Sequence, residues 1–413
     1  METIQNNNLS AKRKMFLFFC LSFFSLNMFP FTLILDNLCE GLLNFTASAF
    51  FGFKEVLNTD STGSGDKARH YIELFISFCL SIIITIIFIF VFRKRNNFDK
   101  LNYWFNVYIR YYMGTMMLIY GLSKVFKSQF LSLGLDQLLE PYGQSSPMGL
   151  AWNFMGHSDL YCFFAGFAEV IAGFFLFFRR TVLFGSILVA GVMFNVMMMN
   201  YGFDIPVKIF STQLVLMALY LAAPDTKRLF DFFFLNKDVK ASYHYANDFS
   251  NKRNRMAKNI AKSIFLALFI VLCVLQSFLN NNQDYKKHPL RGIYLVKTFI
   301  RNNNSVPPLA SDTLRWKLMV INYPTRATFY LYNDSLKRML LQADTVLKKI
   351  KMTRKGNDKT IYSFDYSLKG NELTFKGYSD KDTLEITFQR FNESHFRLVS
   401  RGFHWINEVP YNR

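Results

Sequence analysis

Apolar residues fill seven long blocks in the first two thirds of the chain. The blocks cover roughly residues 15–35, 71–92, 103–124, 160–178, 182–200, 209–223 and 261–279. Several of them approach the ~20 residues that a helix needs to cross the hydrocarbon core of a bilayer. The pattern therefore predicts an α-helical polytopic membrane protein with about seven spans.

The pattern changes after the polar linker "NNNQDYKKHPLR". Apolar and polar residues then alternate in short runs, with the turn-forming stretches "KGN", "SDKD" and "NES" between some of them. Expected strands fall at roughly residues 292–300, 314–321, 327–332, 362–368, 373–375, 384–388 and 396–398. About eight strands predict an antiparallel β domain over residues 285–413, either a small closed barrel or a sandwich. The opening "GIYLVKTFI" resembles the first strand of a lipocalin-like barrel.

Basic residues show which side of the membrane each loop occupies. The chain carries 48 lysines and arginines against 29 acidic residues, a formal charge of +19. Clusters lie at residues 12–14, 93–100, 179–180 and 227–262, which with seven spans all fall on one side. Because cytoplasmic flanks retain positive charge, we expect a cytoplasmic N-terminus and a β domain outside. The charge then reflects orientation and contact with anionic lipid, and it does not indicate nucleic-acid binding. Cleavage of the first block as a signal peptide is an alternative that leaves the orientation unchanged.

Two apolar blocks carry charges on stripes of small residues. In "IRYYMGTMMLIYGLSK", Arg110, Gly114, Gly121 and Lys124 share one helical face. In "FAGFAEVIAGFFLFFRRT", Gly166, Glu169 and Gly173 do the same. Glycines allow close helix packing, and a charge in hydrocarbon needs a partner or water. We expect Glu169 to pair with Arg110, whose guanidinium reaches further, with Lys124 as the other candidate.

This group, with Asn195 on a later block, forms a candidate intramembrane polar site. Two interpretations stay open. The ion pair fixes the order of the helices, or Glu169 lies in a polar cavity and carries a proton or binds a polar ligand head.

A second candidate site is expected near the outer ends of the helices. It comprises Asn200, Asp204 and Lys208 in "MFNVMMMNYGFDIPVKIFS", and His157 in a preceding loop. His157 is either a proton carrier or a hydrogen-bonding surface residue. No second histidine stands at ligand spacing, so we expect no metal site. Cys39 and Cys162 form a disulfide or remain as two free thiols.

Four stretches together resemble the DoxX-like membrane protein family, especially its larger Bacteroidota-type members with an outer β domain. They are the two charged stripes, "SPMGLAWNFMGHS" and "NVMMMNYGFDIPVKIFS", and the similarity covers roughly residues 103–230. The resemblance implies a four-helix bundle core in a bacterial inner membrane. The matching positions are Arg110, Gly121, Lys124, Glu169 and Gly173, with Asp204 and Lys208 in the larger members.

The expected organisation then has four parts. They are an N-terminal pair of transmembrane helices (1–100), the DoxX-like bundle (101–235), a cytoplasmic loop with the last transmembrane helix and linker (236–284), and an extracytoplasmic, periplasmic all-β domain (285–413).

Some DoxX-like proteins are membrane subunits of thiosulfate:quinone oxidoreductase, and others are accessory proteins. We expect an accessory or scaffold subunit without catalytic activity of its own, whose outer β domain docks a partner protein. The alternatives are a quinone-linked redox subunit, with quinone as the cofactor, and a protein that handles lipid or small hydrophobic molecules. Cluster-binding cysteines and flavin motifs are missing from the sequence, which favours the first reading.

Overall fold

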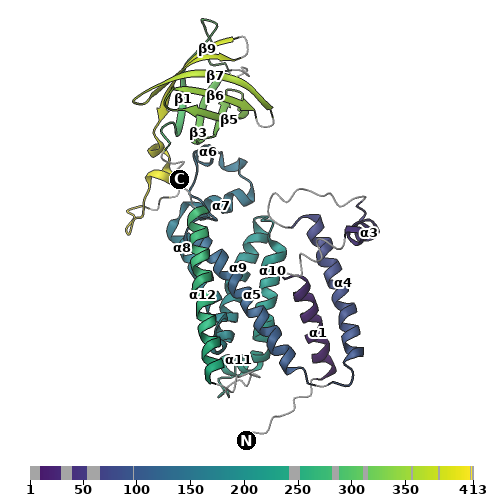
Figure 1. Ribbon diagram of the computed structural model, residues 1–413. Helices are drawn as coiled ribbons and strands as arrows, with labels where there is room; N and C mark the ends of the chain where they lie inside the picture. Colours follow the sequence, from purple (N-terminus) through teal and green to yellow (C-terminus); the bar gives the residue numbers. More distant parts are fainter. Residues whose placement is uncertain are drawn as a thin grey trace. The chain divides into compact units, whose positions relative to one another are not determined.

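A computed structural model describes residues 10–28, 40–53, 66–95, 97–240, 252–280, 288–309, 315–354, 357–379, 382–409 and 411. The chain divides into two compact units. The first is helical and contains residues 1–129, 147–151 and 159–278. The second contains residues 279–413, which form the β structure, together with residues 130–146 and 152–158, which interrupt the helical unit in sequence. Figure 1 labels the elements of both units.

Four helices make the centre of the helical unit. They are α5 (Asp99–Val125), α8 (Asp159–Leu176), α9 (Val182–Gly202) and α10 (Lys208–Ala222). Each helix packs against the next, and α10 returns to α5, so the four form a closed ring. Short connections join α8 to α9 and α9 to α10, which favours antiparallel neighbours. Buried apolar side chains from all four helices, including Met113, Leu176, Val189 and Leu214, form the interior.

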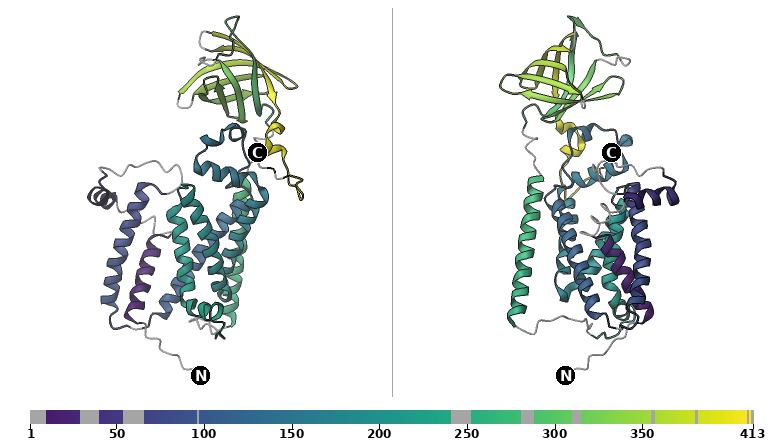
Figure 2. Two further views of the ribbon diagram at one scale, coloured as in Figure 1. Left: turned by 180° about the vertical axis from the view of Figure 1, so that it is seen from behind. Right: turned by 45° about the vertical axis from the view of Figure 1, so that its right-hand side comes forward.

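Further helices surround this ring. α1 (Ala11–Leu26) packs beside α4 (Ala68–Val91), as both views in Figure 2 show, and α1 contributes Phe18 and Phe24 to the same core. α3 (Glu40–Phe51) packs on α4, α11 (Thr226–Phe233) follows α10, and α12 (Lys252–Asn280) precedes the β structure.

Among the residues that the structure describes, five helical segments are long and apolar enough to cross a membrane. They are Ala68–Val91, Asp159–Leu176, Arg179–Gly202, Lys208–Phe233 and Arg253–Asn280. The two other predicted spans lie on α1, which has 16 residues, and on α5, which has 27 residues but carries Arg110 and Lys124. The membrane-embedded character of the helical unit is therefore supported, while the count of seven stays a prediction.

The β unit is a closed antiparallel barrel of eight strands. The strands are β1 (Gly292–Arg301), β3 (Trp316–Tyr323), β4 (Arg326–Leu331), β5 (Leu336–Asp344), β6 (Lys349–Arg354), β7 (Asn357–Lys369), β8 (Glu372–Ser379) and β9 (Asp382–Phe391). Each pairs with the next in sequence order, and β1 pairs with β9 from Ile293–Phe391 to Arg301–Leu384. The short β2 (Asn304–Ser305) pairs with β1. Closure removes the exposed sheet edges that an open meander would have.

Aromatic side chains fill the barrel interior. Trp316 is 1% exposed, and its ring lies 4.1 Å from that of Phe329 and 5.4 Å from that of Tyr362, measured between centroids. Phe364, Phe375 and Phe388 pack in the same cluster. The alternating apolar residues of β8 and β9 were expected to be buried on one face of the sheet, and this is confirmed. The strand expected around Phe396 and Leu398 was wrong, because this stretch forms α13 (Arg397–Ser400).

A helix covers part of the outside of the barrel. Leu135 of α6 (Leu135–Leu139) is fully buried against Ile293, Leu318 and Val320, side chains in β1 and β3. β3 is therefore buried on both faces along most of its length. Because α6 comes from the segment between α5 and α8, residues from the middle of the chain complete the β unit.

Candidate functional site

The site begins where α5 and α8 cross, because glycines bring the two backbones together. A Cβ added at Gly121 would lie 2.8 Å from the carbonyl oxygen of Gly166, and one added at Gly166 would lie 2.5 Å from that of Gly121. Gly173 faces Met117 in the same way, and Gly114 faces the ring of Phe177. Such spacing leaves no room for larger side chains, so the glycines fix the register of the two helices.

An ion pair lies in this crossing. The Lys124 ammonium is 2.8 Å from both carboxylate oxygens of Glu169, and the two side chains are only 8% and 3% exposed. Lys124 also lies over the ring of Tyr120, 5.9 Å from its centroid. One cation therefore contacts both oxygens of the carboxylate and balances its charge inside the helix crossing.

The expected pairing of Glu169 with Arg110 is wrong. A Cβ added at Gly166 would lie 2.7 Å from the Cβ of Lys124, and the lysine side chain extends from there toward Glu169. Arg110 lies fourteen residues earlier on α5, about 21 Å along the helix axis at ~1.5 Å per residue. The longer reach of the guanidinium did not decide the pairing, because the crossing of α5 and α8 brings Lys124, and not Arg110, beside Glu169.

Cys162 was considered from sequence only for a disulfide, and its place in this site was missed. Its thiol donates to the carbonyl oxygen of Lys124 at 3.4 Å, and the residue is a buried free cysteine. The other cysteine of the considered disulfide, Cys39, lies outside the described residues. Asn195 belongs elsewhere, because its side chain is exposed on α9.

The candidate residues at the ends of α9 and α10 join these two helices. The Asn200 amide donates to the Ser211 hydroxyl at 3.0 Å and to the carbonyl of Val207 at 3.3 Å. Lys208 pairs with Asp204 at 2.6 Å, and the Asp204 side chain is largely exposed. These contacts shape a turn and leave Asn200 without a free amide group.

Asp66 was not identified from sequence, yet it caps α10. Its carboxylate accepts hydrogen bonds from the backbone N–H groups of Lys208 and Ile209, which lie more than 140 positions away. A carboxylate at a helix N-terminus is stabilised by the free N–H groups and by the helix dipole. A helix start can be recognised from sequence when the residue just before it is the cap. Here the cap comes from a residue far away in the chain, so the sequence around α10 gives no sign of it.

His157 ends α7 (Pro147–His157) and is exposed. It falls in the β unit, while Asn200, Asp204 and Lys208 fall in the helical unit. Within the residues that the structure covers, no three His, Cys, Asp or Glu side chains lie close enough to hold a metal ion.

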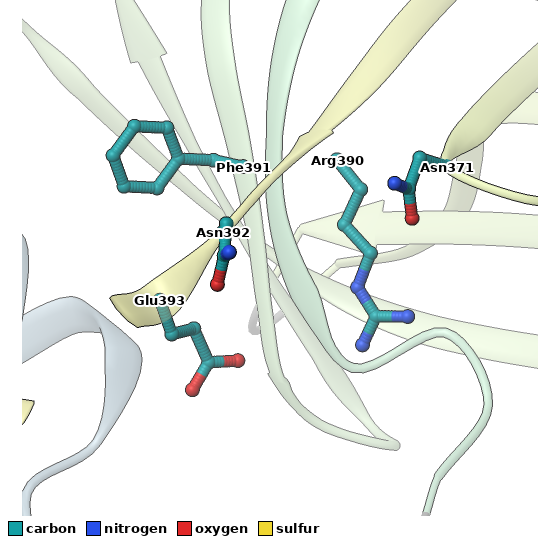
Figure 3. A pocket seen from close by; sticks show the side chains of 5 residues that line it. All are labelled: Asn371, Arg390, Phe391, Asn392 and Glu393. Carbon is teal, nitrogen blue, oxygen red and sulfur yellow. The ribbon is translucent and has the colours of Figure 1, made fainter. Parts of the chain in front are cut away.

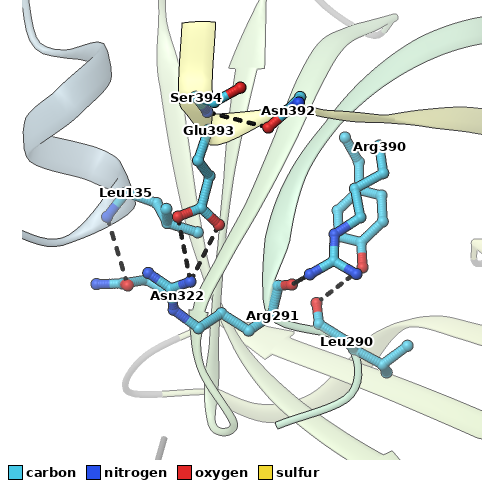
Figure 4. A network of polar contacts seen from close by, with 9 residues as sticks. Leu135, Leu290, Arg291, Asn322, Arg390, Asn392, Glu393 and Ser394 are labelled. Carbon is cyan, nitrogen blue, oxygen red and sulfur yellow. Dashed lines mark hydrogen bonds and ion pairs between the residues drawn. The ribbon is translucent and has the colours of Figure 1, made fainter. Parts of the chain in front are cut away.

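The β unit has a polar cavity of about 340 Å³ at one end of the barrel. Its lining comprises Asn371, Arg390, Phe391, Asn392 and Glu393, shown in Figure 3. Beside it, Arg291 donates to both oxygens of Glu393 at 3.0 and 3.4 Å, and Arg390 donates to the carbonyl of Arg291 at 2.7 Å (Figure 4). These bonds join the start of β1 to the end of β9, so the cavity is bordered by groups that hold the barrel closed.

Apolar side chains are exposed in the C-terminal segment, of which residues 401–409 and 411 are described. Trp405 is 89% exposed, and Phe403, Ile406 and Val409 are exposed to a similar degree. The segment folds on itself: Arg401 lies over the ring of Tyr411 at 4.2 Å and bonds to Asn407. A concentration of exposed aromatic and aliphatic side chains is typical of an interaction surface.

Comparison with known proteins gives one informative match. A stretch of 124 residues, 30% of the chain, is 32% identical to the uncharacterized protein YwoB of Bacillus subtilis (strain 168) and covers 79% of that protein. No family model and no solved structure match.

Proposed function

The chain belongs to the family of the uncharacterized protein YwoB, and on that premise we propose that it is a membrane accessory or scaffold subunit whose β barrel docks a partner protein. The helical unit serves as the anchor in the bacterial inner membrane. Its ring of α5, α8, α9 and α10 supports placing it with the DoxX-like four-helix bundles.

The exposed C-terminal segment carries this proposal. Trp405 and Phe403 stand 5.1 Å apart between ring centroids, and solvent covers most of both side chains. Tryptophan and other large side chains provide much of the energy at protein interfaces when a partner covers them. A surface of this kind favours docking of a protein.

The two internal sites support the same proposal. Lys124 contacts both oxygens of Glu169, so the intramembrane pair is arranged to hold α5 on α8. Trp316 and the surrounding aromatic rings occupy the barrel interior, where a lipid-carrying barrel would need space.

A photo-crosslinking amino acid at position 405 tests the docking surface in living cells. We expect a covalent protein adduct of discrete mass, weakened in a Phe403→Ser background, because both rings belong to one contact surface. The matched control is position 346, a valine in a barrel turn that is 86% exposed. Adducts with lipid alone, or equal adducts at both positions, would reject protein docking.

The proposed orientation puts the N-terminus in the cytoplasm and the barrel in the periplasm, because the basic clusters share one side. Single cysteines at Lys369 and Asn97, both exposed, report it in a background without native cysteines. An impermeant thiol reagent should label the first position in intact cells and the second only after lysis. The opposite labelling would reverse the orientation.

A further inference from the structure

Arg110 lies beside the end of α8. Tyr111, its neighbour on α5, stacks edge-on against Phe177 with 5.2 Å between ring centroids, and a Cβ at Gly114 would meet the same ring at 2.6 Å. α8 ends at Leu176, and the turn η2 (Arg179–Thr181) follows. Arg110 is therefore level with the end of a candidate membrane span, where a bilayer passes from hydrocarbon to headgroups.

Cations from three elements meet at this level. The charges of Arg179 in η2 and of Lys262 in α12 both act on Arg110, and that of Lys258 acts on Lys262. The Lys262 ammonium lies 4.1 Å from the centre of the Phe178 ring. Apart from these cations, the phenol groups of Tyr103 and Tyr111 act on Arg110, and no described carboxylate acts on Arg110 or Lys262.

The Arg110 guanidinium has an unmet hydrogen-bonding need. Its Nε is buried, and in the part of the chain that the structure describes it has no hydrogen-bond partner. A guanidinium presents five donors, and burying a donor without an acceptor is costly. An anion placed among these cations would accept hydrogen bonds from the Arg110 guanidinium and would offset the repulsion between the positive charges.

We propose that Arg110 and Lys262 bind the phosphate of an anionic phospholipid. Arginine recognises phosphate through paired, charge-assisted hydrogen bonds. Basic pockets between transmembrane helices on the cytoplasmic side are suited to anionic headgroups. A lipid fits better than a free phosphate ion, because exposed rings stand nearby and would contact its acyl chains: Phe174 of α8, Phe178 just after α8 and Phe265 of α12. This binding site is separate from partner docking by the barrel.

Thermal unfolding of the delipidated full-length protein in mild detergent tests the site. Added phosphatidylglycerol should raise the melting temperature by several degrees more than phosphatidylcholine does. Arg110→Gln and Lys262→Gln should each weaken phosphatidylglycerol affinity about five-fold, the effect expected of one cation near an anionic headgroup. Arg93→Gln, which removes an exposed cation outside the cluster, is the matched control and should leave the affinity unchanged.

Each remaining outcome counts against the site. Equal stabilisation by the two lipids, or equal loss in Arg93→Gln, would show unspecific attraction. Stabilisation by inorganic phosphate as strong as by phosphatidylglycerol would replace the lipid with a free ion. If Arg110→Gln does not fold, Lys262→Gln decides, because Lys262 lies on the largely exposed α12. In that case we expect lipid extracts of the purified Lys262→Gln protein to contain several-fold less phosphatidylglycerol than those of the wild type. An unchanged phosphatidylglycerol content would overturn the proposal.

Discussion

Lys124→Met and Glu169→Gln should each destabilise the helical unit strongly, and the double variant should recover most of the loss. Each single change leaves one buried partner without its counter-charge, which costs about 3 to 5 kcal/mol, whereas removal of both charges can be nearly neutral. The 2.8 Å contacts and near-complete burial of the pair place it in this class. Thermal unfolding in mild detergent measures the three variants against the wild type.

The pair of Lys208 and Asp204, whose carboxylate is exposed, is the matched control. Its two atoms are 2.6 Å apart, but the Asp204 side chain is 84% exposed. We expect Lys208→Met to cost less than about 1 kcal/mol, because solvent screens an exposed pair. Additive losses in the Lys124 and Glu169 double variant would contradict the pairing.

Trp316→Ala should unfold the barrel at much lower temperature than the wild type. The side chain is 1% exposed and packs against Phe329, Phe364 and Phe388, so its removal leaves a large cavity. Losses of about 3 to 5 kcal/mol are typical for truncation of a buried aromatic residue to alanine. Limited proteolysis during a temperature ramp, with antibody detection of the C-terminal part, measures this in the full chain.

Trp405→Ala provides the comparison for the same chemical change at an exposed position. It should change barrel stability by no more than about 0.5 kcal/mol, since surface substitutions have small effects. Similar losses in the two tryptophan variants would show that the interior is less tightly packed than the ring distances indicate.

Much of the fold followed from two sequence periods. The alternation of residues 384–388 correctly indicated β9, and long apolar blocks marked the five candidate spans. β5 was missed because the exposed Leu336 and Leu340 stand on its polar face and break the alternation, and β6 because it offers only two buried positions, Ile350 and Met352. Closure through β1 and β9 could not be read either, since pairing between distant strands depends on geometry that a local pattern does not contain.

The candidate site was predicted less completely. Glycine spacing indicated which faces of α5 and α8 carry the charges, but the partner of Glu169 depends on the axial offset between the helices. A shift of one helical turn moves every facing pair by about 5.4 Å. Cys162 and Asp66 make their hydrogen bonds to backbone groups that folding brings near them. No local residue pattern predicts such contacts.

The position of α6 on the barrel has a consequence for biosynthesis. The backbone N–H of Leu135 donates to Asn322 at 3.4 Å, across 187 positions of sequence. Ribosomes add about 5 to 20 residues per second, so α6 leaves the ribosome roughly 10 to 40 s before β3 is available to cover it. A chain that stalls or is truncated after α12 therefore displays Leu135 and its apolar neighbours Leu138 and Leu139 uncovered. Such a display distinguishes an unfinished molecule from a finished one, and it is the kind of signal that chaperones and quality-control proteases recognise.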